Sequence, residues 1–216
     1  MIDSTGIKAE GEGEWSARKH GGPKRRIWRK VHIAVDEETL EIRAVEGEQA
    51  NAMGSSEPAH GSHIGDAPML PELLDQIPPD EDIGSVTGDG AFDTRKCHDV
   101  IADRGAEAFG HSLEPMAFMP SLPPRKNAKP WKPTTAGARA GNEILRAVKY
   151  LGPAIWRRWS GYHRQSRVEA KMHCVKRLGQ SLMARDFDRQ VAEIQIRCAV
   201  MNRYTALGTP MTMAVG

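Results

Sequence analysis

Two β-rich segments around a short polar turn limit the fold more than any other feature of this sequence. Residues 29–35, RKVHIAV, alternate polar and apolar side chains, residues 36–39 have turn composition, and the chain returns in residues 40–46. This pattern predicts an antiparallel β-hairpin. The first part of the sheet is therefore expected to be antiparallel.

Helix and strand signals alternate after the hairpin. We expect a helix from Asp66 that ends before Pro78, a short strand at residues 83–87, a helix at 94–104 with Thr94 as its N-cap, a strand near 116–119, and helices at 142–151 and 187–207. This order predicts an α/β fold with a mixed sheet flanked by helices, its antiparallel strands first and its α/β crossovers later.

The opening residues and several connecting stretches are irregular. Residues 1–5 have the character of the end of a strand whose beginning is missing, which predicts a truncated first strand and an N-terminally shortened chain. Residues 10–26 predict a Gly-rich basic loop, and residues 125–141 predict a Pro-rich basic loop. Residues 53–64 and 109–122 show no clear periodicity, and we expect irregular structure in both.

A single acid stands among basic residues in the stretch GYHRQSRVEAKMHCVK, residues 161–176. Nothing from Ser166 to Leu178 breaks a helix. The buried face of this helix is expected to consist of the apolar residues at helical spacing, Val168, Met172 and Val175. The basic residues expected to point to the other side are Arg164, Arg167 and Lys171.

The acid of this helix, Glu169, lies at the edge of the apolar face. It is in line with Tyr162 and Lys176, because a step of seven residues rotates by only about 20°. Lys176 lies roughly 10 Å along the axis at ~1.5 Å per residue, which is too far for a direct ion pair. Glu169 is therefore either a solvated surface acid or a metal ligand with a phosphate-contacting lysine two turns away.

Charge distribution indicates more than net charge, because the 216 residues carry a formal net charge of only +2. Basic residues gather with tryptophans in three patches. The first includes Lys24, Arg25, Arg26, Arg29 and Lys30; the second includes Arg125, Lys126, Lys129, Trp131 and Lys132; the third includes Lys149, Trp156, Arg157, Arg158, Trp159 and Arg164. Such patches suit phosphate neutralisation with base stacking, whereas each alone is also compatible with a solvated loop.

Other features indicate the compartment. The three cysteines are widely spaced and form no CxxC pair, which predicts reduced thiols in a cytoplasmic protein. His60, His63 and Asp66 could bind a metal ion, but no second ligand pair completes a zinc site. No signal peptide opens the chain, and no apolar run is long enough to span a membrane.

Three acids occupy positions where active sites often lie. Asp3 is expected near the end of the first strand, Asp89 at the carboxyl end of a later strand, and Glu169 on a helix that can pack on the same sheet. Together they would make an oxygen-rich site for Mg²⁺ or Mn²⁺, and two such ions can promote phosphodiester cleavage. Taken singly, Asp3 and Asp89 are also compatible with structural turns.

Six segments in order make the sequence similar to a known family. They are DSTGIK (3–8), GEGEWSARKHG (11–21), KRRIWRKVHIAVD (24–36), GDGAFDTRKCHD (88–99), PPRKNAKPWK (123–132) and YHRQSRVEAKMHCVKRLG (162–179). The chain resembles a DDE-type insertion-sequence transposase of the insertion-sequence-five family. The resemblance covers nearly the whole chain.

The resemblance implies an RNase H-like catalytic core and a metal-binding triad of Asp3, Asp89 and Glu169, with two Mg²⁺ or Mn²⁺ ions. It also matches a signature in which Tyr, Arg, Glu and Lys follow one another at set spacing. Tyr162, Glu169 and Lys176 fit it, whereas Gln165 occupies the Arg position and Arg164 precedes it. Lys176 is then expected to contact DNA phosphate.

The implied activity is cleavage and strand transfer of DNA at the ends of an insertion sequence by a nucleoid-associated homo-oligomer. The alternatives are an inactive remnant that only binds DNA, and an unrelated RNase H-like nuclease. The catalytic domain is expected at residues 1–182, with a basic loop at 123–160, followed by a C-terminal helix and tail at 183–216.

Overall fold

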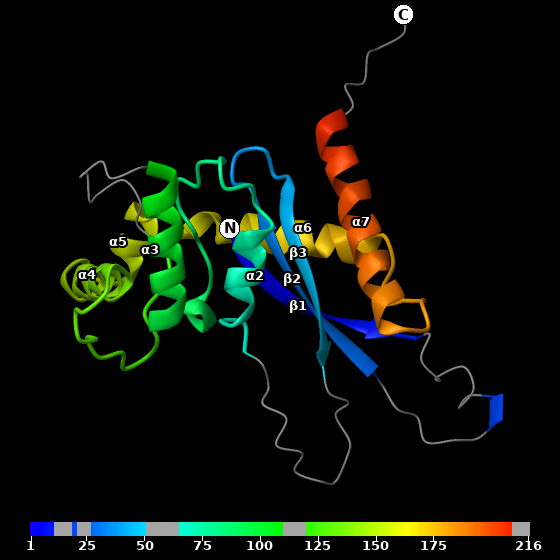
Figure 1. The fold of residues 1–216 in the computed structure, drawn as a ribbon, viewed down its shortest axis with the longest axis horizontal. Helices are drawn as coiled ribbons and strands as arrows, with labels where there is room; N and C mark the ends of the chain where they lie inside the picture. The colour runs from blue at the N-terminus through cyan, green and yellow to red at the C-terminus, as the bar shows by residue number, and fades with distance from the viewer. Residues whose placement is uncertain (11–18, 21–26, 51–64, 110–119, 209–216) are drawn as a thin grey trace, which may run out of the picture.

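The hairpin predicted from the sequence forms one half of the central sheet. The computed structural model describes residues 1–10, 19–20, 27–50, 65–109 and 120–208. Strand β2 (Ile27–Val35) pairs antiparallel with β3 (Ile42–Ala50) and with β1 (Ile2–Ala9), and the short β4 (Ser181–Leu182) pairs parallel with β1. The sheet order is β3-β2-β1-β4 (Figure 1).

The first strand extends further along the chain than the predicted residues 1–5. β1 has eight residues, lies inside the sheet, and pairs with β2 from Ile2 opposite Ala34 to Ala9 opposite Ile27. Asp3 consequently lies near the start of the strand and not near its end. The sequence concealed the second half of β1 because Gly6 interrupts it; the Trp28 side chain of β2 packs over this glycine, 3.4 Å from where a Cβ would stand.

Helices follow the predicted order with some changes of boundary. They are α2 (Met69–Asp75), α3 (Arg95–Phe109), α4 (Ala136–Leu151), α5 (Pro153–Trp159), α6 (Ser166–Arg177) and α7 (Phe187–Leu207). The N-cap at Thr94 is confirmed, since its Oγ1 accepts a hydrogen bond from the Cys97 amide. α4 starts six residues earlier than predicted, because Thr135 caps it, and the loop after residue 125 is correspondingly shorter.

Helix α5 was not predicted. Gly152, with φ of 82°, ends α4 and reverses the chain, and Pro153 then opens α5. A positive φ is a conformation that glycine adopts readily and that most other residues avoid. α4 and α5 lie beyond α3, away from the sheet (Figure 1).

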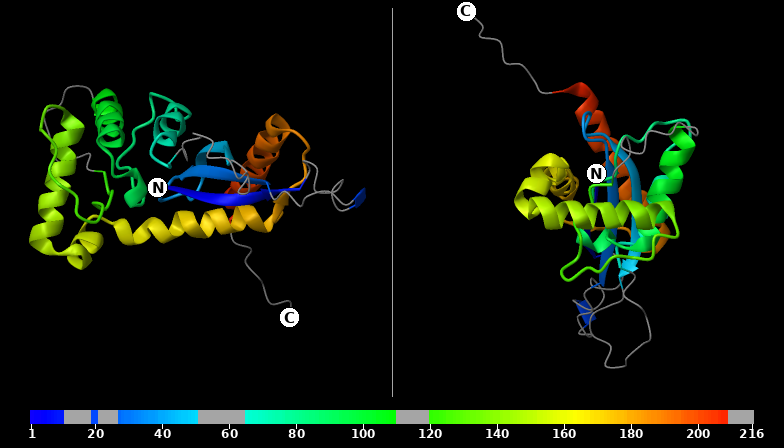
Figure 2. Two further views of the ribbon diagram at one scale, coloured as in Figure 1. Left: turned by 90° about the horizontal axis from the view of Figure 1, so that it is seen from below. Right: turned by 90° about the vertical axis from the view of Figure 1, so that its left-hand side faces the viewer.

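Two hydrophobic clusters cover the two faces of the sheet. On one face, Val168, Met172 and Val175 of α6 pack with Ile7 of β1, and Ile194 of α7 belongs to the same cluster. On the other face, α2 and α3 pack against the side chains of Ile2, Ala34 and Ala44. Figure 2 shows α6 on one side of the strands and α2 and α3 on the other. The expected division at residues 182/183 therefore does not separate two cores.

The segment at residues 83–87 is not the regular strand that we predicted. Only Thr87 forms a bridge, parallel to Ser121, and its carbonyl oxygen accepts a hydrogen bond of 2.7 Å from the Ile2 amide. The strand predicted near 116–119 and the irregular stretch at 53–64 lie outside the described residues. Within the described residues, none of the helices is long and apolar enough to cross a membrane.

Candidate active site

The backbone of Ile2 joins the three elements that carry the predicted acids. Its amide donates to the Thr87 carbonyl oxygen, two residues before Asp89, at 2.7 Å. Its carbonyl oxygen accepts a hydrogen bond of 2.6 Å from Nε2 of Gln165, four residues before Glu169. One peptide neighbour of Asp3 thus holds both of the other segments beside β1.

The three carboxylates lie in one electrostatic neighbourhood. Burial raises the pKa of Asp3 above its ordinary value, and the charges of Glu169, Asp89 and Asp66 raise it further, although a hydrogen bond from the Ser4 amide opposes them. Burial likewise raises the pKa of Tyr162, with contributions from all three acids. The charges of Asp89 and Glu169 thus act on both Asp3 and Tyr162.

The three acids do not converge on one point. Asp89 and Glu169 are exposed, whereas Asp3 is half-buried. In the part of the chain that the structure describes, no three His, Cys, Asp or Glu side chains lie close enough to hold one metal ion. The chemistry of the donors nevertheless suits a hard divalent cation, since all three are carboxylates and a cation would relieve the repulsion that raises the pKa of Asp3.

The carboxylate of Asp89 is fixed by the 3-10 turn that follows it, Gly90–Phe92. Its Oδ1 accepts a hydrogen bond of 2.8 Å from the Ala91 amide, so that Asp89 caps the turn. A side chain at Gly88 would stand 3.0 Å from Phe92 and 3.2 Å from Leu122, which explains why glycine precedes the acid. Close packing at Gly88 and the hydrogen bond from the Ala91 amide therefore both restrict the conformation of Asp89.

Lys176 lies beside the first acid strand. Its Nζ donates to Oγ1 of Thr5 at 2.5 Å, and Thr5 is on the same face of β1 as Asp3, since side chains alternate along a strand. Lys176, the last residue of the predicted line with Tyr162 and Glu169, therefore contacts β1. Lys171, in contrast, was wrongly expected to point outward: it is 9% exposed and donates to Oγ1 of Thr205 on α7.

Tyr162 is surrounded by residues of α5. Its ring lies 6.0 Å from that of Trp156, which is buried, and the Arg157 guanidinium lies 5.8 Å from its centroid. The sequence placed Arg157 only in a basic patch. Between Arg157 and Tyr162 the chain passes through Gly161, which has a φ of 75°, and the spacing of residues did not reveal that the two side chains meet.

Several residues predicted to bind DNA have partners within the protein. The prediction that Arg29 binds DNA is wrong, because its side chain is only 5% exposed. It donates to Oε1 of Gln190 at 2.6 Å and stacks over Phe187. Lys30 pairs with Asp66 at 2.6 Å, and Arg164 pairs with Glu37 of the β2–β3 turn.

Arg125 and Lys126, which were also predicted to bind DNA, are adjacent in the loop after residue 122. Both side chains are exposed, and that of Arg125 donates to backbone carbonyl oxygens. Lys24, Arg25 and Arg26 lie outside the described residues.

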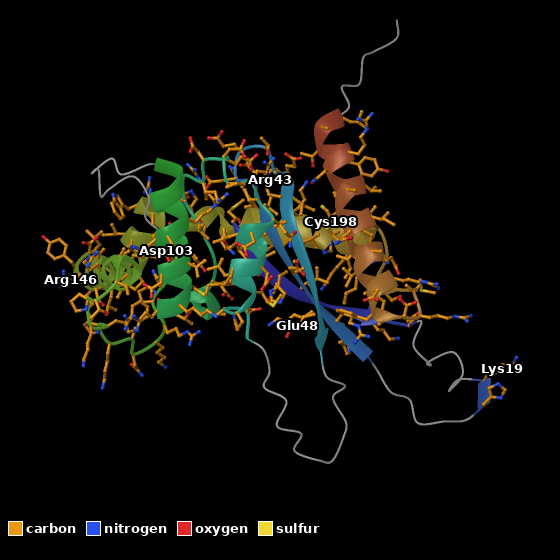
Figure 3. The ribbon with its side chains drawn as sticks, viewed as in Figure 1. Lys19, Arg43, Glu48, Asp103, Arg146 and Cys198 are labelled. Carbon is orange, nitrogen blue, oxygen red and sulfur yellow. The ribbon has the colours of Figure 1, made fainter. Side chains whose placement is uncertain are left out.

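A basic and aromatic surface remains at the corner between α4 and α5. Tyr150 is 91% exposed and Trp159 is 63% exposed, and Lys149, Arg157 and Arg158 are exposed nearby in sequence. Within the described residues, none of these three cations takes part in an ion pair. Figure 3 shows Arg146 on the side of α4 that is away from the sheet.

A buried polar cluster on the opposite face of β1 was not predicted. His32 is fully buried, with its ring nitrogens 3.6 Å from carboxylate oxygens of Asp66 and Glu48. Burial lowers the pKa of His32 to about 4, against the charge of Asp66 and together with that of Lys30. Only its position in the alternating hairpin could have indicated that this histidine points inward.

Comparison with known families identifies the class of protein. The profile of the transposase DDE domain matches residues 1–203, nearly the whole chain. The chain therefore belongs to the transposase DDE domain family. No solved structure matches it. The α/β fold, with its mixed sheet and flanking helices, agrees with this membership, which implies DNA as a partner and transposition-related chemistry of DNA cleavage.

Proposed function

We propose that this chain catalyses metal-dependent DNA strand cleavage and strand transfer at the ends of an insertion sequence, as a cytoplasmic, nucleoid-associated enzyme. The observation that carries the proposal is the pair of backbone hydrogen bonds made by Ile2. Its amide binds the Asp89 segment and its carbonyl oxygen binds the Glu169 segment, so that both lie against the strand of Asp3. Membership of the DDE family supports it. The motifs of the sequence favour the insertion-sequence-five group within that family.

The proposed fold of the catalytic core is RNase H-like. Three antiparallel strands come first, and β4 then pairs parallel with β1. The Thr87 segment also lies beside β1 and bridges in parallel to Ser121. These contacts support a sheet that continues beyond β1 and ends at the acid-bearing turn of Asp89.

Asp3, Asp89 and Glu169 would hold two Mg²⁺ or Mn²⁺ ions. When bound, such ions supply Lewis-acid stabilisation of the oxygens of a phosphodiester. Burial, together with the charges of Glu169, Asp89 and Asp66, raises the pKa of Asp3, and cations would stabilise all three carboxylates in their ionised form. The exposure of Asp89 and Glu169 leaves them open to a large substrate.

The remaining residues would orient the DNA. Lys176, now bonded to Thr5, is close enough to β1 to exchange that hydroxyl for a phosphate oxygen. Tyr162 presents a ring among the acids, and Arg157 adds positive charge beside it. The α4–α5 corner, with exposed Tyr150, Trp159 and Arg158, would then contact the flanking DNA by phosphate neutralisation and stacking.

A second copy of the chain is the proposed partner on the outer face of α7. The large apolar side chains exposed on α7 are Ile196, Val200, Tyr204 and Leu207, and their spacing puts them on one face, opposite the buried Ile194 and Cys198. An antiparallel pair of α7 helices about position 198 would set Ile196 against Val200. A two-fold interface of this kind brings the same apolar face of the two copies together.

Nicking of a DNA duplex that carries the flanking element ends tests the function, with Mg²⁺, Mn²⁺ or EDTA present. We expect cleavage that needs the cation, is lost in Glu169→Ala, and leaves salt-sensitive DNA binding in place. Cleavage that survives in Glu169→Ala would contradict the assignment of the acids. Absence of cleavage by the unaltered chain, with DNA still bound, would instead indicate a protein that only binds DNA.

A further inference from the structure

A reciprocal pair of contacts joins Arg125 to the turn that presents Asp89. Nε of Arg125 donates to the Gly90 carbonyl oxygen at 3.0 Å, and its Nη2 donates to the Ala91 carbonyl oxygen at 2.7 Å. In return, the backbone amide of Arg125 donates to Oδ2 of Asp93 at 2.8 Å. The Arg125 side chain thus binds the backbone of the turn, and the Asp93 side chain binds the backbone at Arg125.

Asp93 is itself held from a second direction. It is 8% exposed, and its Oδ1 lies 3.1 Å from Nε2 of His98 on α3, which is 1% exposed. The His98 ring in turn packs edge-on against Trp131, with 5.3 Å between the centroids.

The support continues into α4. The side-chain amide of Asn142, which is 7% exposed, donates to the Trp131 carbonyl oxygen and accepts from the Trp131 amide, both at 2.8 Å. A side chain at Gly141 would stand 2.3 Å from the Trp131 ring, so this ring lies tightly against α4. An unbroken series of contacts therefore connects α4 to the turn after Asp89.

We propose that Arg125, with Asp93, is a positioning residue that holds the Asp89 turn, and that it is not a DNA-phosphate contact. The inference rests on the proposed function, in which Asp89 is a metal ligand. The guanidinium is already committed to two carbonyl oxygens of the turn, in the forked geometry that arginine provides and lysine does not. Both residues are exposed, but Lys126 makes no such hydrogen bond and is the residue of this loop suited to phosphate.

Arg125→Gln and Lys126→Gln make a matched pair, since both remove one positive charge at adjacent positions. For Lys126→Gln, we expect the slope of log Kd against log salt for duplex DNA to fall by about 0.9, without faster hydrogen exchange of the Ala91 amide. For Arg125→Gln, we expect an unchanged slope and KM, a fall in kcat of at least tenfold, and faster hydrogen exchange of the Ala91 amide. Arg125→Lys, which keeps the charge, is expected to resemble Arg125→Gln.

Two outcomes would overturn the proposal. One is a reduced salt slope in Arg125→Gln with the Ala91 amide still protected. The other is full cleavage activity in Arg125→Lys. Hydrogen exchange of the metal-free protein needs no activity, so the positioning role remains testable if the unaltered chain does not cleave DNA. In that case the proposed function would fail, whereas faster exchange in Arg125→Gln, without faster exchange in Lys126→Gln, would still support the contact between Arg125 and the turn.

Discussion

Nε2 of Gln165 donates a hydrogen bond of 2.6 Å to the carbonyl oxygen of Ile2, which ties the start of α6 to the strand that carries Asp3. Gln165 occupies the position at which the family signature has arginine, and it is 5% exposed. In this chain its side chain is therefore buried and binds another part of the protein. It connects two of the three predicted acid-bearing elements and leaves contact with DNA to other residues.

Gln165→Leu is expected to lower the free energy of unfolding by about 1–3 kcal/mol, because the buried Ile2 carbonyl oxygen loses its side-chain donor. Urea denaturation measures this change. The adjacent Arg164→Gln, which removes an exposed ion pair with Glu37, should cost less than about 1 kcal/mol. Equal losses in the two variants would argue against a special role for the Gln165–Ile2 contact.

Asp3→Asn is expected to raise the melting temperature at pH 7 in the absence of divalent cations. The pKa of Asp3 is raised by burial and by Glu169 and Asp89, so the folded protein binds this proton more tightly than the unfolded chain does. The ionised carboxylate therefore destabilises the fold at neutral pH, and this penalty disappears as pH falls through the folded pKa. The difference between variant and unaltered protein should shrink accordingly in acid.

Divalent cations should reverse the order of the two melting temperatures, of Asp3→Asn and of the unaltered chain. Mn²⁺ is expected to raise the melting temperature of the unaltered chain more than that of Asp3→Asn, since the variant lacks one anionic ligand. Thermal unfolding with and without Mn²⁺ at pH 7 measures the effect. An identical cation response in both proteins would remove Asp3 from the proposed metal site.

Acid should destabilise this protein partly through His32. Its folded pKa of about 4 lies below the ordinary value of 6.5, so the stability that it contributes is complete above pH 6.5 and is lost as pH falls toward 4. Between pH 7 and pH 4.5, unaltered protein should lose about 2–3 kcal/mol more than His32→Leu in urea denaturation. Parallel losses in both proteins would assign the acid sensitivity to other groups.

Arg158 and Arg29 should respond differently to the same substitution. Arg158→Gln is expected to reduce the slope of log Kd against log salt by about 0.9 with little change in stability, since its side chain is exposed at the α4–α5 corner. Arg29→Gln should leave that slope unchanged and lower the free energy of unfolding by about 1–3 kcal/mol, since it loses a buried hydrogen bond to Gln190. A slope reduced only in Arg29→Gln would contradict both assignments.

Ile196→Asp should convert a dimer to a monomer if the outer face of α7 binds a second copy. The substitution places a charge at the first position of the apolar stripe, next to the proposed two-fold axis, where it would be buried in the pair. Sedimentation velocity over a range of protein concentrations measures the effect. Leu178→Asp, at a 40% exposed leucine outside α7, is the control and should leave the association unchanged.

Periodicity and local chemistry were enough to determine much of the secondary structure. The hairpin, α6 and α7 were predictable because apolar spacing and turn residues are local properties, and α7 has the bounds that the sequence indicated. The first strand and the 83–87 segment were not, because Gly6 hid the continuation of β1 and because the pairing of Thr87 depends on partners far away in the chain.

The six motifs determined the family, and they named Asp3, Asp89 and Glu169 as candidates. Only the tertiary structure decided which charged side chains are free. Arg29 and Arg125 look like surface cations in a basic sequence, yet one is buried against Gln190 and the other binds the turn after Asp89. Sequence spacing cannot reveal this difference, because the hydrogen-bond acceptors lie 161 and 34–35 residues away and approach these arginines only when the chain has folded.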